Sequence, residues 1–390
     1  MNEPRETFDI GIVGGGQLGL MLTEAAIPLG LRTLVLDPDP KCPAAMVAPV
    51  LTGELTDPAA LTALVSRCSV TTFEIEHTDP QHLCALEEKG ARFAPSPRVL
   101  DLISDKLRQK QFFREGGLPI PRILATDPSG THGGPEPVVQ KTRFGGYDGR
   151  GVARVMPGER FPLPGPSFIE EAVTIDREIA VIVALSAEGE LATWDPVEMI
   201  FDPRLNLVSD VVTPADLPQT TARAALEIAS AAAHLLKPLG FSGVLAVELF
   251  SDSRGKVLLN EVAPRPHNSG HVTIESSRCS QFEQHLRCVA GFPLGVTTAI
   301  GPAAMVNLLG PEGVNGEYHT MGVREALRFS DVHLHLYGKG STRPGRKLGH
   351  LTARAPDANT ARDIAREAAA AIRFKGKNEV NMSDERKGSW

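Results

Sequence analysis

The sequence is poor in several features that would each place it in a particular class of protein. It has five cysteines in 390 residues, with no CxxC pair and no spacing typical of a zinc site, which suits a reducing compartment rather than a disulfide framework. Aromatic residues make up only 5%, and no apolar run approaches the roughly 18 residues of a membrane span. No basic segment followed by an apolar one opens the chain, so we expect a cytoplasmic protein without membrane association.

The chain also lacks an excess of positive charge, because 40 basic residues against 47 acidic ones give a formal net charge of −7. This balance does not suggest a nucleic-acid-binding surface, although a local basic patch for a small phosphate remains compatible with it. The hydrophobic fraction of 42% is that of an ordinary globular protein. At about 150 residues per domain, the length predicts two or three domains.

The pattern of apolar segments divides the chain into three domains and a tail. Short apolar strands alternate with helix-like segments over residues 1–102, which predicts a parallel α/β domain. Residues 103–296 form the expected central domain, in which Pro/Gly-rich stretches bracket a lid at about 127–185. Further strands and an Ala-rich helix predict a small domain over 297–377, and 378–390 is a polar tail. The expected fold class is α/β and α+β.

A glycine-rich turn near the start is typical of a dinucleotide-binding fold. In "IGIVGGGQLGLM" the residues Gly14, Gly16 and Gly19 have G-x-G-x-x-G spacing, and Asp37 follows at the distance expected of a ribose-binding acid. One hypothesis is therefore a nicotinamide or flavin oxidoreductase. Nothing else in the chain requires a dinucleotide, so we expect Asp37 to match by coincidence and the turn to approach a different anion.

Two glutamates interrupt the apolar rows of two neighbouring strands, "GVLAVELF" and "KVLLNEVAP". If the hairpin pairs Phe250 with Val257, Glu248 lies opposite Leu259 and diagonal to Glu261, close enough for one cation to bridge the two carboxylates. Oxygen ligands completed by water or phosphate favour Mg²⁺ over zinc. The alternative is that both glutamates lie at a solvated edge or pair with arginine.

Three further segments carry groups that suit anions. The loop "KTRFGGYDGRGV" combines glycines with Lys141, Arg143 and Arg150, which favours phosphate binding over a flexible surface hairpin. In "APRPHNSGH" a stiff segment holds Arg265 beside further donors, which suits a carboxylate or carbonate. The third segment, "YGKGSTRPGRKLGH", contains Lys339 and is either a second phosphate site or a solvated basic turn.

Taken in order, these segments resemble the ATP-grasp superfamily and, within it, the 5-(carboxyamino)imidazole ribonucleotide synthase family. The likeness runs from "GGGQLG" through "TTFEIEH", "GGYDGRG", "FIEEAV" and "NEVAPRPHNSGH" to about residue 375. It implies an ATP-grasp fold with an N-terminal Rossmann-like (pre-ATP-grasp) domain, a central ATP-grasp domain with a lid and a small C-terminal domain.

The resemblance assigns residues to each ligand. It implies that ATP is bound by Lys106, Lys141, Gly146, Tyr147, Asp148, Gly149, Arg150, Gly151, Glu170, Glu171, Ala172, Val173, Glu178, Asn260 and Glu261. It implies substrate contacts from Gln17, Leu18, Tyr147, Asp148, Arg150, Arg265, His267, Asn268, Lys339 and Arg346. Asp148, Arg265, His267 and Asn268 would be catalytic, and Glu248 and Glu261 would hold Mg²⁺, with Mn²⁺ as the alternative ion. Strand alternation by itself points Asn260 away from this site.

The implied reaction is the carboxylation of the amine of 5-aminoimidazole ribonucleotide by ATP and bicarbonate, through carboxyphosphate, in purine biosynthesis. The implied partners are these three small molecules and a second copy of the chain in a homodimer. Two positions depart from the family pattern: Lys106 stands where an arginine is usual, and Phe201 where a histidine is usual. Both departures bear on nucleotide affinity, because lysine cannot fork onto a phosphate and phenylalanine offers no polar contact.

Two other functions compete with this one. Another ATP-grasp ligase that acts on a ribotide, such as a formate-using transformylase, would share the architecture. A catalytically silent nucleotide-binding protein would bind ATP without turnover.

Overall fold

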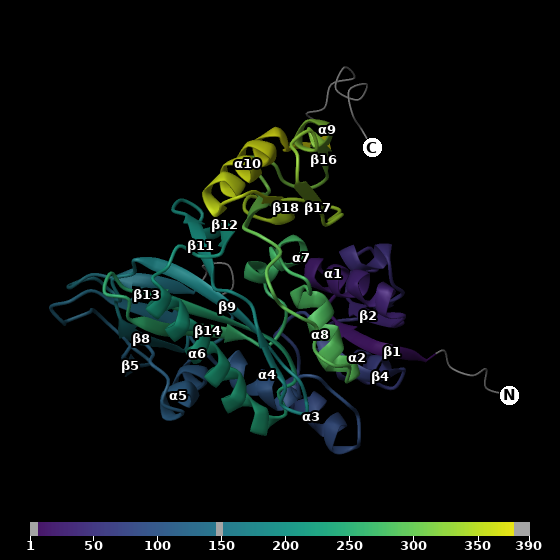
Figure 1. Ribbon diagram of the computed structural model, residues 1–390. Coiled ribbons are helices and arrows are strands. Elements are labelled where there is room, and N and C mark those ends of the chain that lie inside the picture. Colours follow the sequence, from purple (N-terminus) through teal and green to yellow (C-terminus); the bar gives the residue numbers. More distant parts are fainter. Residues whose placement is uncertain (1–6, 146–150, 378–390) are drawn as a thin grey trace.

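The computed structural model describes residues 7–145 and 151–377, which form three regions around a common centre (Figure 1). The N-terminal domain lies beside the central domain, and the C-terminal domain sits above both (Figure 1). Among these described residues, no helix is long and apolar enough to cross a membrane.

The N-terminal domain is the parallel α/β unit that the sequence predicts. Its sheet has the order β3-β2-β1-β4, built from β1 (Phe8–Val13), β2 (Thr33–Asp37), β3 (Val50–Thr52) and β4 (Cys68–Phe73). Helices α1 (Gln17–Ala26), α2 (Pro58–Val65) and α3 (Pro80–Glu88) cover it. Ile12 packs in the core under α1 and Val13 in the core under α2, as expected for a sheet buried on both faces. The strand expected at "ARFAPS" is reduced to one bridge between Phe93 and Thr71.

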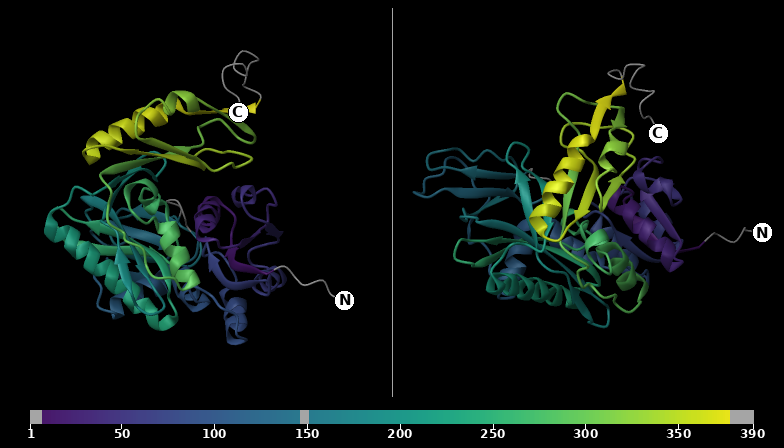
Figure 2. Two further views of the ribbon diagram at one scale, coloured as in Figure 1. Left: turned by 45° about the vertical axis from the view of Figure 1, so that its right-hand side comes forward. Right: turned by 45° about the horizontal axis from the view of Figure 1, so that its top comes forward.

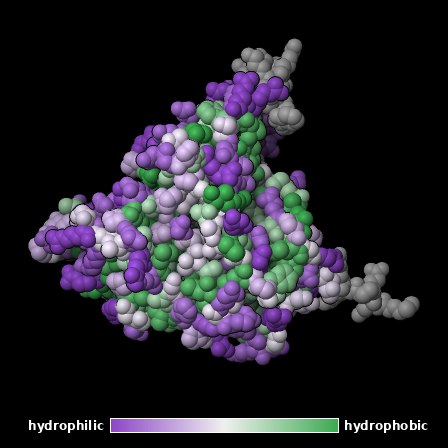
Figure 3. Space-filling model, viewed as in Figure 1, coloured by the Kyte–Doolittle hydropathy of each residue, from purple (hydrophilic) through white to green (hydrophobic). Residues whose placement is uncertain are grey.

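Helices α4 (Pro97–Ser104) and α5 (Lys106–Glu115) lead into a small antiparallel sheet that forms the lid. The lid sheet has the order β5-β8-β6-β7, with β5 (Ile123–Thr126), β6 (Val138–Thr142), β7 (Val152–Val155) and β8 (Ser167–Glu171). Strands β6 and β7 pair on either side of the glycine loop, as predicted. The lid projects from the molecule (Figure 2), and hydrophilic residues gather at its tip (Figure 3).

One large sheet runs through the central and C-terminal domains. Within the described residues it has nine strands, with the order β14-β13-β9-β11-β12-β15-β18-β17 and β10 paired to β9. The strands are β9 (Arg177–Leu185), β10 (Leu191–Thr193), β11 (Val197–Asp202), β12 (Leu207–Thr213), β13 (Gly243–Ser251), β14 (Val257–Ala263), β15 (Ala303–Leu309), β17 (Val332–Leu336) and β18 (Lys347–Arg354). Because β12 pairs with β15, the sheet continues across the domain boundary that the sequence places near residue 297.

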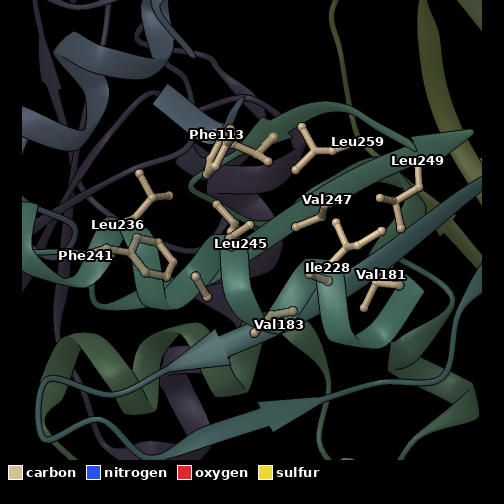
Figure 4. Packing of buried hydrophobic residues seen from close by; sticks show 14 of the residues in the cluster. Phe113, Val181, Val183, Ile228, Leu236, Phe241, Leu245, Val247, Leu249 and Leu259 are labelled. Carbon is tan, nitrogen blue, oxygen red and sulfur yellow. The ribbon is translucent and has the colours of Figure 1, made fainter. Parts of the chain in front are cut away.

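The largest core lies between this sheet and α6 (Gln219–Leu236). Its apolar side chains point toward one another from β9, β13, β14, α5 and α6 (Figure 4). Ile228 and Leu236 from α6 meet Val247 and Leu249 of the sheet. Each such side chain contributes about 1.5–3 kcal/mol on burial. The core therefore gives the strands that carry the candidate site a rigid support.

The remaining elements close the molecule. They are α7 (Thr273–Ser276), α8 (Gln281–Ala290), α9 (Val323–Ala326) and α10 (Ala358–Ala371), with a two-stranded sheet of β16 (Tyr318–Met321) and β19 (Arg373–Gly376). In the described part of the chain, 3₁₀ turns lie at Ile27–Leu29, Pro43–Met46, Lys237–Leu239 and Asn268–Gly270. Helix α8 packs on both α1 and β13, so it joins the N-terminal and central domains.

Candidate active site

The glycine turn before α1 is occupied by side chains of the protein itself. Gly16 and Gly19 donate their backbone N–H groups to the two carboxylate oxygens of Glu74, at 2.7 and 2.5 Å. Gly15 donates to Asp37 Oδ2 at 2.8 Å. A Cβ on Gly19 would lie 2.5 Å from the backbone carbonyl oxygen of Gly14, which explains the need for glycine there.

These contacts show which anion lies at the glycine turn, and they weaken the oxidoreductase hypothesis. The anion at the α1 N-terminus is the carboxylate of Glu74, where an oxidoreductase would hold a pyrophosphate. Asp37 has a structural role in this turn, because it accepts from Gly15 and holds the turn closed. The burial of Glu74 raises its pKa, and the two glycine N–H groups oppose that shift.

Helix α5 is fixed at its first turn by Asp105. The Asp105 side chain accepts from the N–H groups of Leu107 and Arg108 and also pairs with Arg143 at the end of β6. The Lys106 N–H donates to the Arg143 carbonyl at 2.8 Å. Because of these contacts, the start of α5 and the strand that carries Lys141 are held together.

The two predicted metal ligands face each other directly, in a register that differs from the predicted one. Phe250 pairs with Leu258 instead of Val257, and a bulge between this pair and Glu248 shifts the ladder by one further residue, so that Glu248 pairs with Glu261. The bulge reverses the alternation after Leu259, so Glu261 lies on the face opposite to Leu259.

The same bulge corrects the expectation for Asn260. Its Oδ1 accepts a hydrogen bond from Lys141 Nζ at 2.7 Å, so Asn260 faces the site. Lys106 Nζ lies 2.8 Å from Glu261 Oε2, so the lysine expected on a phosphate contacts a predicted metal ligand instead. The two lysines therefore contact two consecutive residues of β14, Lys141 at Asn260 and Lys106 at Glu261.

The charges of this carboxylate pair are unbalanced. Burial raises the pKa of Glu248, and the facing Glu261 and nearby Glu178 raise it further. Burial also acts to raise the pKa of Glu261, but the Lys106 ammonium outweighs it and the pKa falls. Two opposed, partly buried carboxylates, only one of which contacts Lys106, suit an additional cation with oxygen ligands. The donor set therefore fits Mg²⁺.

Glu170 lies between two lysines in the lid-proximal part of the site. Its carboxylate contacts Lys141 Nζ, and its Oε2 lies 2.9 Å from Lys110 Nζ. Burial acts to raise the pKa of Glu170, but the two ammonium groups outweigh it and the pKa falls. The sequence reasoning missed Lys110, although its spacing of one helical turn from Lys106 in "DKLRQKQ" was a usable signal.

The segment after Glu170 begins at the end of β8, an inner strand of the lid sheet. Glu171 pairs with Arg122 at 2.7 Å, and Ala172 and Val173 are half-buried at the end of β8. Glu178 opens β9 opposite Phe250, on the face that also carries Glu248. Burial raises the pKa of Glu178 to about 7, although Lys141 opposes the shift.

Phe201, one of the two departures from the family pattern, lies on β11. It packs against the apolar cluster that includes Ala180 and Met199, and Met199 is the residue that pairs with Glu178. The aromatic ring therefore extends the apolar surface beside Glu178.

The segment after β14 presents the predicted anion-binding groups. His267 Nε2 lies 3.5 Å from Glu248 Oε1, which joins this segment to the carboxylate pair. The buried Gln281 holds the segment, because it accepts from the His267 N–H at 3.0 Å and donates to the His267 carbonyl at 2.7 Å. Among the described residues, neither amide atom of the buried Asn268 has a partner. An unpartnered buried amide is costly, so Asn268 is suited to a ligand.

Arg265 is engaged by a residue that sequence reasoning did not single out. Its guanidinium lies 2.9 Å from Glu76 Oε1 and donates to Glu76 Oε2 at 3.1 Å. Glu76 belongs to "FEIEH", the segment at the end of β4 that also supplies Glu74. Arg265 therefore links the central domain to the N-terminal domain.

The remaining predicted substrate residues lie in the loop between β17 and β18 and at the start of α1. Lys339 donates to the Lys347 carbonyl at 2.8 Å, and Arg346 donates to the Ser341 carbonyl at 2.9 Å, within the loop between β17 and β18. Gln17 is half-buried at the start of α1. The Leu18 side chain is packed in the core under α1, so only its backbone is available to a substrate.

Part of the predicted set falls on a segment that the structure does not describe. Gly146, Tyr147, Asp148, Gly149 and Arg150 lie outside the described residues. Gly151, the first residue after them, accepts at its carbonyl from the Thr142 N–H at 2.9 Å.

A histidine cluster supports the anion-binding segment from the C-terminal domain. His271 packs against His350, which stacks on His335 with ring centroids 4.4 Å apart and an interplanar angle of 12°. His335 Nε2 lies 2.7 Å from Glu275 Oε1. In rings that are nearly parallel, the nitrogen lone pairs do not converge on one point, so this geometry favours a hydrogen-bonded domain junction over a metal site.

Comparison with known proteins identifies the family. Three family models match in order along the chain: a ribonucleotide synthetase preATP-grasp domain over residues 7–104, an ATP-grasp domain over 134–282 and a phosphoribosylaminoimidazole carboxylase C-terminal domain over 303–364.

Individual relatives match over most of their length. The chain is 38% identical to N5-carboxyaminoimidazole ribonucleotide synthase of Synechococcus elongatus over 357 residues, covering 88% of each protein. It superposes on the Thermotoga maritima N5-carboxyaminoimidazole ribonucleotide synthetase with a TM-score of 0.86 at 38% identity, covering 95% of this chain and 100% of that one. An Aspergillus clavatus N5-carboxyaminoimidazole synthase in complex with ADP and 5-aminoimidazole ribonucleotide superposes with a TM-score of 0.79 at 28% identity, covering 94% and 99%.

The fold class and the family expected from the motifs are thereby confirmed. The chain belongs to the N5-carboxyaminoimidazole ribonucleotide synthase family of ATP-grasp enzymes.

Proposed function

We propose that this enzyme carboxylates the amine of 5-aminoimidazole ribonucleotide with ATP and bicarbonate, through carboxyphosphate, as a step of purine biosynthesis. Family membership supports the ATP-dependent formation of the N5-carboxylated ribotide. The observation that carries the rest of the proposal is the opposed pair Glu248 and Glu261, of which Glu261 contacts Lys106 and Glu248 lies beside His267 of the anion-binding segment.

ATP is proposed to lie between the lid sheet and the central sheet. Lys141, from the lid, and Lys106, from α5, supply the cations for its phosphates, and both already contact acceptors on β14. The backbone of Glu170–Val173 would bind the adenine, and Glu178 would bind the ribose. Where the family pattern has a histidine, Phe201 offers the nucleotide an apolar surface next to Glu178, so a packing contact would take the place of a polar one.

Glu248 and Glu261 would hold Mg²⁺, with Asn260 beside them, and Mn²⁺ is the alternative ion. When bound, the ion neutralises charge on the nucleotide phosphates. The side chains of the protein would then position the nucleotide. Lys106 and Lys141 orient the γ-phosphoryl group, and Glu261 keeps Lys106 in place through their contact.

Bicarbonate is a poor electrophile, and the enzyme must activate it. In the proposed step an oxygen of bicarbonate attacks the γ-phosphorus, the bond to the β-phosphate oxygen breaks, and carboxyphosphate and ADP form. His267 and Asn268 hold the carbonate portion, and Arg265 lies beside them on Glu76. The amine then attacks the carbonyl carbon, or CO₂ released from it, and phosphate leaves. Asp148 is the proposed group that orients the amine or accepts its proton.

The ribotide is proposed to lie between the three domains. Its phosphate would meet Lys339 and Arg346, and its sugar would lie near the start of α1 at Gln17 and the backbone of Leu18. Tyr147 and Arg150 are proposed as further contacts from the glycine loop. We also propose a cytoplasmic homodimer, which rests on the family resemblance alone; light scattering after gel filtration would give the molar mass of the assembly.

The experiment that tests the function compares substrates. Purified protein is incubated with ATP and Mg²⁺, with either bicarbonate and 5-aminoimidazole ribonucleotide or formate and a glycinamide ribotide, and phosphate release is followed. Release is expected only with bicarbonate and the aminoimidazole ribotide. Release that requires formate would identify a transformylase instead, and tight ATP binding without release would identify a silent nucleotide-binding protein.

A further inference from the structure

Lys110 lies on α5 one turn after Lys106, and its ammonium group is enclosed by the protein. Its side chain and that of Glu170 are each 2% exposed, whereas those of Lys106 and Lys141 are 19% and 9% exposed. Since a nucleotide phosphate must approach from the open side of the site, the two more exposed lysines are the ones it meets. Lys110 instead contacts Glu170, with Nζ 2.9 Å from Oε2.

Glu170 therefore receives one ammonium from α5 and another from β6. An ionised carboxylate that has left water needs such partners, because its desolvation costs several kcal/mol when it is unpaired. Burial and the neighbouring Lys141 lower the pKa of Lys110 to about 8, while Glu170 opposes that shift. The shared carboxylate offsets part of the repulsion between the two ammonium groups.

A bound polyphosphate changes this balance, because Lys141 then has a second anion to contact. If Lys141 were the sole cation on Glu170, its turn toward a phosphate would leave a buried carboxylate unpaired. That penalty would be subtracted from the binding of ATP. The contact between Lys110 and Glu170 removes the penalty, since Glu170 keeps one partner in both states.

We propose that Lys110 is a positioning residue for ATP: it holds Glu170 charged and in place, so that Lys141 can leave Glu170 for the phosphates without exposing an unpaired buried charge. This inference rests on the proposed assignment of Lys141 to the ATP phosphates. It assigns to Lys110 no contact with ATP, with the ribotide or with bicarbonate.

The test is a double-mutant cycle in the full-length enzyme. The variants are Lys110→Met, Glu170→Gln and both together, and the control is Arg114→Met, which removes an exposed charge one turn further along α5. Lys110→Met is expected to raise KM for ATP about tenfold or more, with a smaller change in kcat and none in KM for the ribotide. In the double variant the unpaired carboxylate is gone, so KM for ATP should fall back by about tenfold relative to Lys110→Met.

A role in packing alone gives a different result. Lys110→Met would then lower the melting temperature without a specific change in KM for ATP, and adding Glu170→Gln would not recover affinity. Either outcome overturns the proposal.

If Lys110→Met does not fold, Lys110→Arg replaces it. With a guanidinium in place of the ammonium, KM for ATP should stay constant above pH 8, where that of the native enzyme rises as Lys110 loses its proton.

The charged groups around Lys110 must be considered in that pH comparison. They are Glu170 on β8, Lys141 on β6 and Glu261 on β14.

Lys141→Met separates this inference from the function on which it rests. If Lys141→Met leaves KM for ATP unchanged, the proposed ATP site is wrong. If Lys141→Met weakens ATP binding while Lys110→Met behaves like Arg114→Met, only the role of Lys110 is refuted.

Discussion

Replacement of Glu261 by glutamine tests the carboxylate pair. The change removes one of two directly opposed carboxylates and the charged acceptor of Lys106, at 2.8 Å. A charge-assisted contact contributes about 1.5–3 kcal/mol, and a bound cation contributes several kcal/mol to stabilising phosphoryl charge. A combined loss of about 4 kcal/mol lowers the rate roughly 10³-fold. The fold should persist, because glutamine has nearly the same shape and the repulsion of Glu248 is relieved.

The assay couples ADP formation to a spectroscopic readout in the presence of bicarbonate and the ribotide. Glu227→Gln, an exposed glutamate on α6, is the matched control and should retain native activity. Titration of ADP with and without Mg²⁺ adds a binding readout, in which the effect of Mg²⁺ should disappear in Glu261→Gln. Retention of more than about a tenth of the native rate, with the Mg²⁺ effect intact, would refute the metal assignment.

Three further predictions address the rest of the site. Asn268→Ala should leave the melting temperature unchanged or higher, because the buried amide has no partner among the described residues, yet lower kcat/KM for bicarbonate by about 10- to 100-fold; a lower melting temperature with full activity would show a structural role. Glu74→Gln should lower the free energy of unfolding by about 1–3 kcal/mol in urea titration, because an amide cannot accept from both Gly16 and Gly19, whereas the exposed Glu54→Gln should change little. Since burial raises the pKa of Glu178 to about 7, its carboxylate forms as pH rises through that value, so ADP should bind more tightly at pH 8 than at pH 6, and a Glu178→Gln variant with the same pH dependence would contradict this. The same raised pKa means that the contribution of Glu178 to stability is present below its unfolded pKa and is lost as pH rises through about 7.

Local patterns in the sequence predicted the elements well. Alternating and helical periodicities located the α/β domain, the lid strands on either side of the glycine loop and the hairpin that carries Glu248 and Glu261. These features depend on neighbouring residues, so a period of two or of 3.6 is sufficient to find them.

Features that depend on distant residues or on one irregular position were missed. The bulge beside Asn260 inserts one residue into the ladder, and a period-two reading therefore placed Asn260 on the wrong face. Glu74 is 58 residues from Gly16, and its place at the α1 N-terminus follows from the pairing of β1 with β4. Only the folded chain shows that the turn typical of dinucleotide binding already holds a carboxylate.

The most direct test of the account follows oxygen from bicarbonate. The enzyme is supplied with ATP, the aminoimidazole ribotide and ¹⁸O-labelled bicarbonate, and the released phosphate is analysed by mass spectrometry. The proposed attack of bicarbonate on the γ-phosphorus predicts one ¹⁸O atom in each phosphate formed. Unlabelled phosphate, released at the same rate as the carboxylated ribotide appears, would contradict it.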